Sequence, residues 1–369
     1  MHIVLDGSPL TIATGGIRRY TEQLAVALQK LPHDDEITLA CDRPLLNASV
    51  LADNGIRVID EPARGWRKRW WSLGAGSACR SMGASVFHGT DFTVPYLHPC
   101  ASVLTIHDLS PWRYPRWQPE AGRIRQRTPW LLRLGRADMV ITVSEAVRRE
   151  TITRFSLAEE QVVTTPLAAD ERFRPVSGAL PPAGLVAAHA PEDFFKKPWF
   201  LFVGTIEPRK NVATLIQAWE ELSAGEANLC IVGRLRADGV PIPVKPGLRW
   251  MPAASDEDLI WLYTHATAVL YPSHYEGFGL PVLEAMQCGA PVVTGDSPAL
   301  AELVGDAGIV LPPNDARAWT SAMRRILDDS SLRPVLSTKA LNRSAAFRWS
   351  DTARRTREVY REAITRFGR

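Results

Sequence analysis

The chain has 369 residues, more than one hydrophobic core usually supports, so two domains are expected. Hydrophobic residues make up 46% and charged residues 22% of it, which is typical of a globular protein and excludes a disordered or fibrous one. The net charge is only +3, and the five scattered cysteines show no CxxC spacing, which argues against a disulfide scaffold and favours a reducing compartment.

Short apolar runs alternate with helical patterns along the chain, which predicts a parallel α/β architecture. The runs are continuously apolar, as expected for strands that helices cover on both faces. In the first half the predicted strands are 2–6, 37–41, 56–59, 84–87, 103–106, 139–143 and 162–165. In the second half they are 200–203, 229–232, 248–250, 268–271, 291–294 and 308–311.

The first strand begins at residue 2 and is too short, and too poor in preceding basic residues, for a signal peptide. No window reaches the ~20 apolar residues of a membrane-spanning helix. We therefore expect a cytoplasmic protein.

A stretch rich in proline and glycine separates the two halves of the chain and predicts an interdomain linker. We expect an N-terminal Rossmann-like domain over 1–170, a linker over 171–197 and a C-terminal Rossmann-like domain over 198–349. The charged final helix, about 350–369, could pack on either domain, including back on the first.

Paired glycines stand between the first strand and a predicted helix over 17–28. Ligands of open parallel sheets bind at the carboxyl ends of strands, near helix N-termini. Gly15 and Gly16 would let an anion approach bare backbone amides there, although a plain turn explains the pair equally well.

Two adjacent cations follow the strand 200–203. Gly204 opens the loop, Arg209 and Lys210 come later in it, and a helix is predicted to begin near Asn211. Cations at a strand's carboxyl end beside a helix N-terminus favour binding of a diphosphate over a merely solvated basic pair.

A glycine-flanked loop follows the strand 268–271 and presents Glu276, while Glu284 lies in the helix that comes next. The amides of Phe278, Gly279 and Leu280 would be open to an oxygen-rich ligand. Each carboxylate could accept hydrogen bonds from a pair of neighbouring hydroxyl groups. The alternative for either glutamate is helix capping.

His107 ends the strand 103–106 and is a candidate for function at the same sheet edge. A single histidine is more often structural, so the position alone does not decide.

Two segments combine basic residues with tryptophan, which suits the surface of an anionic bilayer. Residues 63–80 contain no acid, and residues 111–136 contain seven arginines against one glutamate. Their tryptophans are Trp66, Trp70, Trp71, Trp112, Trp117 and Trp130. A solvated basic face over buried tryptophans is the alternative, and no nucleic-acid-binding module is present to favour nucleic acid.

The segment 276–286, with its E-x7-E pair, and the segment 204–211 resemble family 4 of the retaining glycosyltransferases, which have the GT-B fold. Looser matches at 15–16, 88–90, 107–108 and 142–144 fall in the expected order. Within the family, the pattern is similar to bacterial mannosyltransferases that build O-antigen or exopolysaccharide. The resemblance implies two Rossmann-like parallel-sheet domains that face each other across a cleft.

The resemblance also implies roles for the candidate residues. Glu284 would bind the ribose of a nucleotide-diphosphate sugar, and Glu276 would contact the transferred sugar. Arg209 and Lys210 would neutralise the departing diphosphate. Amides of Gly15, Gly16, Phe278, Gly279 and Leu280 would hold phosphate and sugar oxygens. Gly204 would belong to the donor-binding loop, and His107 would lie on the acceptor side.

The implied activity is hexosyl transfer, with mannose from GDP-mannose as the first expectation. The expected acceptor is a glycan or a polyprenyl-diphosphate-linked sugar at the cytoplasmic face of the inner membrane. No metal or other cofactor is expected, because no DxD-type acidic cluster is found in the right place. The alternatives are a glycosyltransferase that uses a UDP-sugar, a nucleotide-sugar 2-epimerase of similar fold, and a non-catalytic sugar-nucleotide-binding protein.

Overall fold

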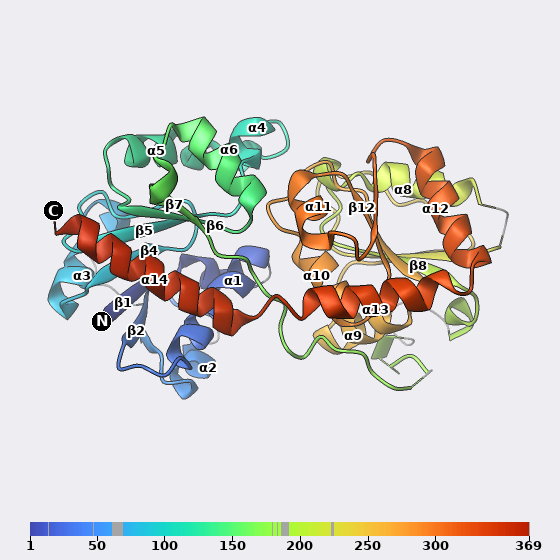
Figure 1. Cartoon of the computed structure of the whole chain (residues 1–369), viewed down its shortest axis with the longest axis horizontal. Coiled ribbons are helices and arrows are strands. Elements are labelled where there is room, and N and C mark those ends of the chain that lie inside the picture. Colours follow the sequence, from blue (N-terminus) through green and yellow to red (C-terminus); the bar gives the residue numbers. More distant parts are fainter. Residues whose placement is uncertain are drawn as a thin grey trace. The chain divides into compact units, whose positions relative to one another are not determined.

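The structure is a computed structural model of the whole chain (Figure 1). It describes residues 1–13, 15–46, 48–60, 69–178, 180–182, 184–185, 192–222 and 225–368. The chain divides into two compact units. Unit 1 comprises Met1–Ala168 and Arg348–Arg369, and unit 2 comprises Ala169–Phe347.

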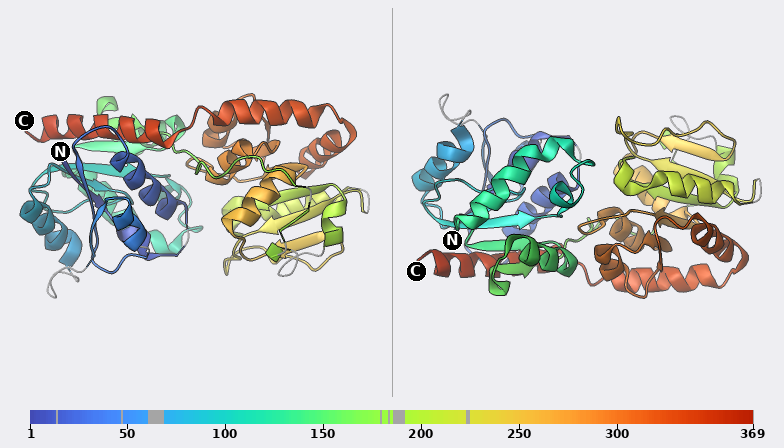
Figure 2. Two further views of the ribbon diagram at one scale, coloured as in Figure 1. Left: turned by 90° about the horizontal axis from the view of Figure 1, so that it is seen from below. Right: turned by 90° about the horizontal axis from the view of Figure 1, so that it is seen from above.

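Unit 1 is built on a parallel sheet that has seven strands among the described residues, in the order β3-β2-β1-β4-β5-β6-β7. The strands are β1 (His2–Asp6), β2 (Glu36–Ala40), β3 (Arg57–Ile59), β4 (Val86–Gly89), β5 (Ala101–Ile106), β6 (Met139–Thr142) and β7 (Val162–Thr164). The central strands β4, β5 and β6 are buried along their whole length, because helices cover both faces (Figure 2).

The helices of unit 1 connect these strands and close the sheet. They are α1 (Gly16–Gln29), α2 (Ala48–Asp53), α3 (Ala75–Met82), α4 (Ser110–Arg113), α5 (Gly122–Arg133), α6 (Glu145–Phe155) and, from the far end of the chain, α14 (Trp349–Phe367). The last helix packs on α1 and β5 (Figure 1). Tyr360 of α14 lies 2.7 Å, from hydroxyl oxygen to Nδ1, from the fully buried His88.

Unit 2 repeats the architecture with a parallel sheet in the order β10-β9-β8-β11-β12-β13, six strands among the described residues. The strands are β8 (Trp199–Val203), β9 (Asn228–Val232), β10 (Leu248–Met251), β11 (Ala268–Tyr271), β12 (Val292–Gly295) and β13 (Ile309–Leu311). The helices are α8 (Val212–Glu220), α9 (Asp256–His265), α10 (Leu280–Gln287), α11 (Pro298–Val304), α12 (Ala316–Asp328) and α13 (Leu332–Ser344).

Both sheets reverse their strand order at one point, between β1 and β4 in unit 1 and between β8 and β11 in unit 2. Chains leave such neighbouring strands in opposite directions, so a crevice forms at their carboxyl ends where ligands bind. The predicted fold class of two Rossmann-like parallel sheets is confirmed. Every predicted strand is present, with bounds that differ by two residues or fewer.

The tryptophan-rich segments differ in how they are exposed. Trp66 lies outside the described residues, and Trp70 is buried in the core of unit 1 with Trp71 packed against it. Trp130 on α5 is 52% exposed. Among the described helices, none is both long and apolar enough to cross a bilayer.

Candidate active site

The switch point of unit 2 brings together two loops that the sequence singled out. After β8, the chain passes through Gly204 and a 3₁₀ turn over Pro208–Lys210, and Asn211 at φ 53° leads into α8. After β11, the chain reaches Glu276. The amide of His274 donates to the carbonyl oxygen of Arg209 at 2.9 Å, which ties the two loops together.

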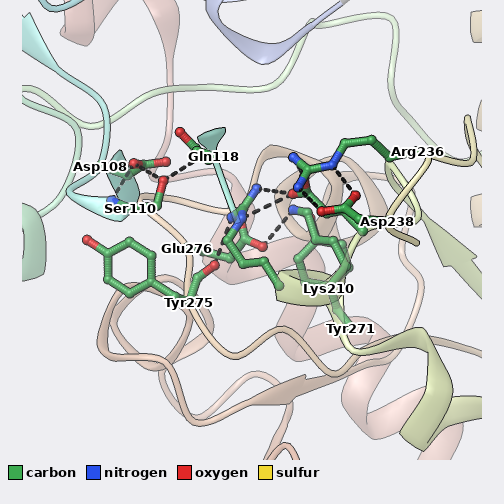
Figure 3. A network of polar contacts seen from close by, with 11 residues as sticks. Asp108, Ser110, Gln118, Lys210, Arg236, Asp238, Tyr271, Tyr275 and Glu276 are labelled. Atoms are coloured by element: carbon green, nitrogen blue, oxygen red, sulfur yellow. Dashed lines mark hydrogen bonds and ion pairs between the residues drawn. The ribbon is translucent and has the colours of Figure 1, made fainter. Parts of the chain in front are cut away.

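Glu276 forms the centre of a buried ion-pair network (Figure 3). Lys210 Nζ lies 2.6 Å from Glu276 Oε1, and Arg209 Nη1 lies 3.0 Å from Glu276 Oε2. Lys210 also donates to the hydroxyl oxygen of Tyr271, at 2.5 Å. Arg209 donates through Nη1 to the carbonyl oxygen of Tyr275 at 2.8 Å. Both cations are therefore held in defined positions at the ends of β8 and β11.

A second carboxylate extends this network toward β9. Glu207 Oε1 lies 2.8 Å from Arg209 Nη2, and Glu207 Oε2 lies 2.8 Å from Arg236 Nη1. Arg236, in the loop after β9, also forms a two-bond ion pair with Asp238 (Figure 3). The network joins three cations to three carboxylates, so its formal charge balances.

Burial and charge pull the pKa values of this network in opposite directions. For Lys210, burial is the largest effect and lowers its pKa, and the charge of Arg209 lowers it further. For Glu276, burial would raise the pKa, but the charges of Arg209 and Lys210 outweigh it and the pKa lies below its usual range. Glu276 is therefore ionised, and the site combines a charged carboxylate with strongly desolvated cations.

Helix α10 begins beside this network. Gly279 is its N-cap residue at φ 105°, and Pro281, which has no amide hydrogen, lies in its first turn. The amides of Val282 and Leu283 donate to the carbonyl oxygen of Gly279 at 2.9 and 3.1 Å. Glu284 is buried in the second turn, where its Oε2 accepts a hydrogen bond of 3.2 Å from the hydroxyl of Tyr263. Burial raises the pKa of Tyr271, and the charges of Glu276 and Glu284 raise it further.

The unit 1 candidates occupy loops at the carboxyl edge of its own sheet. His107 is buried after β5, and its Nε2 lies 2.7 Å from the carbonyl oxygen of Thr90. A carbonyl only accepts, so Nε2 carries the proton and Nδ1 carries the lone pair. Burial lowers the pKa of His107, which keeps the ring neutral. Gly15 and Gly16, both exposed, are the N-cap and first residue of α1.

The structure places Arg209, Lys210 and Glu276 in direct contact, with Gly204 and Gly279 in the loops around them. Gly15, Gly16 and His107 belong to unit 1 and are not part of this network. Sequence reasoning missed Glu207, Tyr271, Arg236 and Asp238. Glu207 was detectable, because it lies two residues before Arg209 in the same loop, whereas Arg236 becomes a neighbour only through the pairing of β8 with β9.

Within the part of the chain that the structure describes, there is no group of three or more His, Cys, Asp or Glu side chains that could hold a metal ion.

Comparison with known protein families matches both units. The family described as "Glycosyltransferase Family 4" matches residues 14–173, and that described as "Glycosyl transferases group 1" matches residues 189–343. O-antigen chain mannosyltransferase B of Escherichia coli is 34% identical over 307 residues, which are 80% of this chain and 77% of that protein. A D-inositol 3-phosphate glycosyltransferase of Kineococcus radiotolerans is 29% identical over 62% of this chain and 58% of its own length.

Solved structures share the fold over nearly the whole chain. HepE of Anabaena, in complex with UDP-glucose, has a TM-score of 0.76 at 15% identity and covers 97% of this chain and 98% of its own. WaaG, a glycosyltransferase involved in lipopolysaccharide biosynthesis, has a TM-score of 0.68 at 15% identity and covers 97% of this chain and 99% of its own.

Proposed function

Because the chain belongs to the family 4 glycosyltransferases and has their GT-B fold, we propose that it transfers mannose from GDP-mannose, with retention of configuration, to a glycan or polyprenyl-diphosphate-linked acceptor. The product would be a bacterial surface polysaccharide, as the name of the E. coli relative indicates for that protein.

The observation that carries the proposal is the contact of Arg209 and Lys210 with Glu276 at the switch point of unit 2. Negative charge grows on the diphosphate as the sugar departs, and its stabilisation is usually the largest single need of such a reaction. Two desolvated cations fixed in place meet that need, because they do not have to reorganise when the charge develops.

Glu276 has a double role in the proposed reaction. In the unliganded protein it neutralises both cations and keeps them paired. When the donor binds, its diphosphate takes over part of that pairing, and Glu276 can accept hydrogen bonds from hydroxyl groups of the sugar. Amides at the start of α10, from Phe278 to Leu280, would bind the remaining oxygens. Gly204, whose own amide donates to the carbonyl oxygen of Val232 at 2.9 Å, would line the donor site. Glu284 would bind the ribose.

We propose that the leaving phosphate takes the proton of the acceptor hydroxyl on the same face of the sugar, without a metal ion. His107, with Gly15 and Gly16, would act from unit 1. The neutral ring of His107 offers the lone pair of Nδ1 as an acceptor to a hydroxyl group. The hydrogen bond from Nε2–H to the carbonyl oxygen of Thr90 fixes the orientation of the ring.

The exposed side of α5 supports a membrane-surface location for the acceptor. Trp130, Leu134, Arg123 and Arg133 are exposed at helical spacing along α5 and its C-cap. Such a mixture of large apolar and cationic side chains fits the interface of an anionic bilayer. We propose that the protein binds the cytoplasmic face of the inner membrane through this side.

Product analysis tests the proposed activity. The enzyme is incubated with GDP-mannose alone and with GDP-mannose plus a panel of mannoside and lipid-linked acceptors. We expect a new α-mannosidic linkage and release of GDP only when an acceptor is present, apart from slow hydrolysis. Epimerised nucleotide sugar without acceptor would favour the 2-epimerase, and transfer only from UDP-sugars would favour the other glycosyltransferase alternative.

A further inference from the structure

Unit 1 holds a second group of charged side chains, which the proposed donor site does not use. Asp6 ends β1 and Asp91 follows β4 by two residues, so both lie where the strand order of the sheet reverses. This is the edge at which open parallel sheets bind ligands. The equivalent strands of unit 2, β8 and β11, lead into Lys210 and Glu276.

The loop after β4 is folded tightly against β1. A Cβ on Gly89 would lie 1.7 Å from the carbonyl oxygen of Thr93, and Phe92 adopts φ 54°, a conformation that is costly for an aromatic residue. The hydroxyl of Thr90 donates to the backbone carbonyl of Asp6 at 2.8 Å. The close return of the chain and this bond hold Asp91 beside the end of β1.

Arg127 of α5 completes the group, and it interacts electrostatically with both Asp6 and Asp91. Asp6 is 1% exposed, and its Oδ1 accepts from the amide and hydroxyl of Ser8. Its Oδ2 is buried and has no hydrogen-bond partner among the described residues. Oδ1 of Asp91 and Nε of Arg127 are likewise buried atoms that have no hydrogen-bond partner among the described residues. As whole residues, Asp91 and Arg127 are only half-buried, so a ligand can reach them from solvent.

Buried polar atoms without partners are rare in proteins, because each costs free energy until a ligand or a water satisfies it. Burial raises the pKa of Asp6 to about 7, although the two hydrogen bonds from Ser8 lower it, and burial raises the pKa of Asp91 to about 6. Arg127 beside them argues against a bound cation and in favour of a neutral ligand that both donates and accepts hydrogen bonds.

Aromatic rings border the same group. The guanidinium of Arg127 lies 5.4 Å from the centroid of Trp71, and the amide of Tyr96 donates to the carbonyl of Trp71 at 2.8 Å. The ring of Tyr96 in turn packs edge-on against Trp130, with 5.7 Å between centroids. Polar side chains that converge beside aromatic rings suit a sugar, which has hydroxyl groups at its rim and apolar C–H faces.

We propose that Asp91 and Arg127 bind hydroxyl groups of the acceptor sugar, with Asp6 behind them as a positioning residue. This inference rests on the proposed function and assigns its acceptor subsite. The proposed subsite adjoins His107, because both are in contact with Thr90. The backbone carbonyl of Thr90 accepts from Nε2 of His107, and the hydroxyl of Thr90 donates to the backbone carbonyl of Asp6.

Steady-state kinetics of Asp91→Asn and Arg127→Gln test the assignment, with methyl α-mannoside, mannobioses and methyl β-N-acetylglucosaminide as soluble acceptors. We expect the acceptor KM to rise about tenfold or more in both variants. The KM for the donor and the slow rate of donor hydrolysis without acceptor should stay unchanged. A merely structural defect would change both of these quantities. Asp6→Asn should raise the acceptor KM less.

Asp138→Asn is the matched control. Asp138 is another carboxyl of unit 1 whose pKa burial raises, but it lies just before β6 at the amino edge of the sheet, where it accepts from the amide of Ser102 at 2.7 Å. Its acceptor KM should equal that of the wild type. An unchanged acceptor KM in Asp91→Asn and Arg127→Gln would overturn the assignment. A wild-type enzyme that hydrolyses the donor but binds none of the three soluble acceptors would overturn it as well. A wild type that binds no nucleotide sugar would instead overturn the proposed function.

Discussion

Glu276 is the residue on which the proposed donor site depends, because it pairs with Lys210 and Arg209 in a buried environment. Removal of one partner from such a pair leaves an uncompensated buried charge, which is strongly destabilising. In the proposed reaction these residues would also stabilise the departing diphosphate, and the two roles can be measured separately.

A double-mutant cycle measures the stabilising role. Lys210→Met and Glu276→Gln should each lower the unfolding free energy by about 2 to 4 kcal/mol, and the double variant should cost about 1 to 3 kcal/mol less than the sum. Urea denaturation gives these values. The exposed pair Arg354 and Glu358 on α14 is the control, with a coupling of about 0.5 kcal/mol or less. Equal couplings for the two pairs would show that the buried network is not formed in solution.

The buried carboxyl of Asp6 predicts a pH dependence of stability. Burial raises its pKa from 3.8 to about 7. Between about pH 4 and pH 7 the folded state therefore keeps this carboxyl protonated, while the unfolded state has already released the proton. The unfolding free energy should therefore fall as pH rises through this window, by up to about 4 kcal/mol if the whole shift is realised. Above pH 7 the loss is complete.

Asp6→Asn removes the titration and keeps an oxygen that can accept from Ser8. Its melting temperature relative to the wild type should therefore rise between pH 4.5 and pH 7.5. Thermal unfolding followed by circular dichroism in a series of buffers is the measurement. A constant difference across that series would contradict a raised pKa for Asp6.

At the scale of elements, the close approach of the loops after β8 and β9 positions the network. A Cβ on Gly233 would lie 2.0 Å from the carbonyl oxygen of Gly204, and Gly233 has φ 141°. Only glycine allows this approach, which brings Arg236 within reach of Glu207.

Gly233→Ala should therefore destabilise the protein by about 2 kcal/mol or more and raise the KM for the donor. Differential scanning calorimetry and donor kinetics report the two effects. Gly122→Ala at the start of α5 is the control, because the nearest atom to its Cβ would be Arg125 Nη2 at 3.7 Å. If both variants melt like the wild type, the loops are not packed as described.

The strands were predictable because each is a continuous apolar run between helical patterns, as in β8 and β11. The proximity of Lys210 and Glu276 followed from the same reasoning, since both come after strand ends. The direct ion pairs of Glu276 with Lys210 and Arg209 were not predictable, because they depend on how the loops fold and not on local pattern. Asp6 and Asp91 escaped notice for a related reason: nothing in the sequence shows that a buried oxygen lacks a partner.

At the scale of the whole molecule, the exposed side of α5 predicts binding to anionic membranes. Arg123→Ser with Arg133→Ser should weaken sedimentation with phosphatidylglycerol vesicles several-fold at low salt, because each cation near the surface contributes about 1 kcal/mol. Trp130→Ser should weaken binding even at high salt. Arg355→Ser with Arg361→Ser, on the exposed side of α14, removes the same charge and should have little effect. Equal losses for both arginine pairs would mean that only net charge matters.

The central claim is that unit 2 binds a nucleotide-diphosphate sugar through Arg209, Lys210 and Glu276. Isothermal titration calorimetry of the full chain with GDP-mannose, UDP-glucose, ADP-glucose and dTDP-glucose tests it most directly. We predict the lowest Kd for GDP-mannose, a rise of tenfold or more in Lys210→Met, and no change in Lys339→Met, which removes a lysine from an exposed ion pair with Asp306. Binding of none of these sugars by the wild type, or an unchanged Kd in Lys210→Met, would contradict the claim.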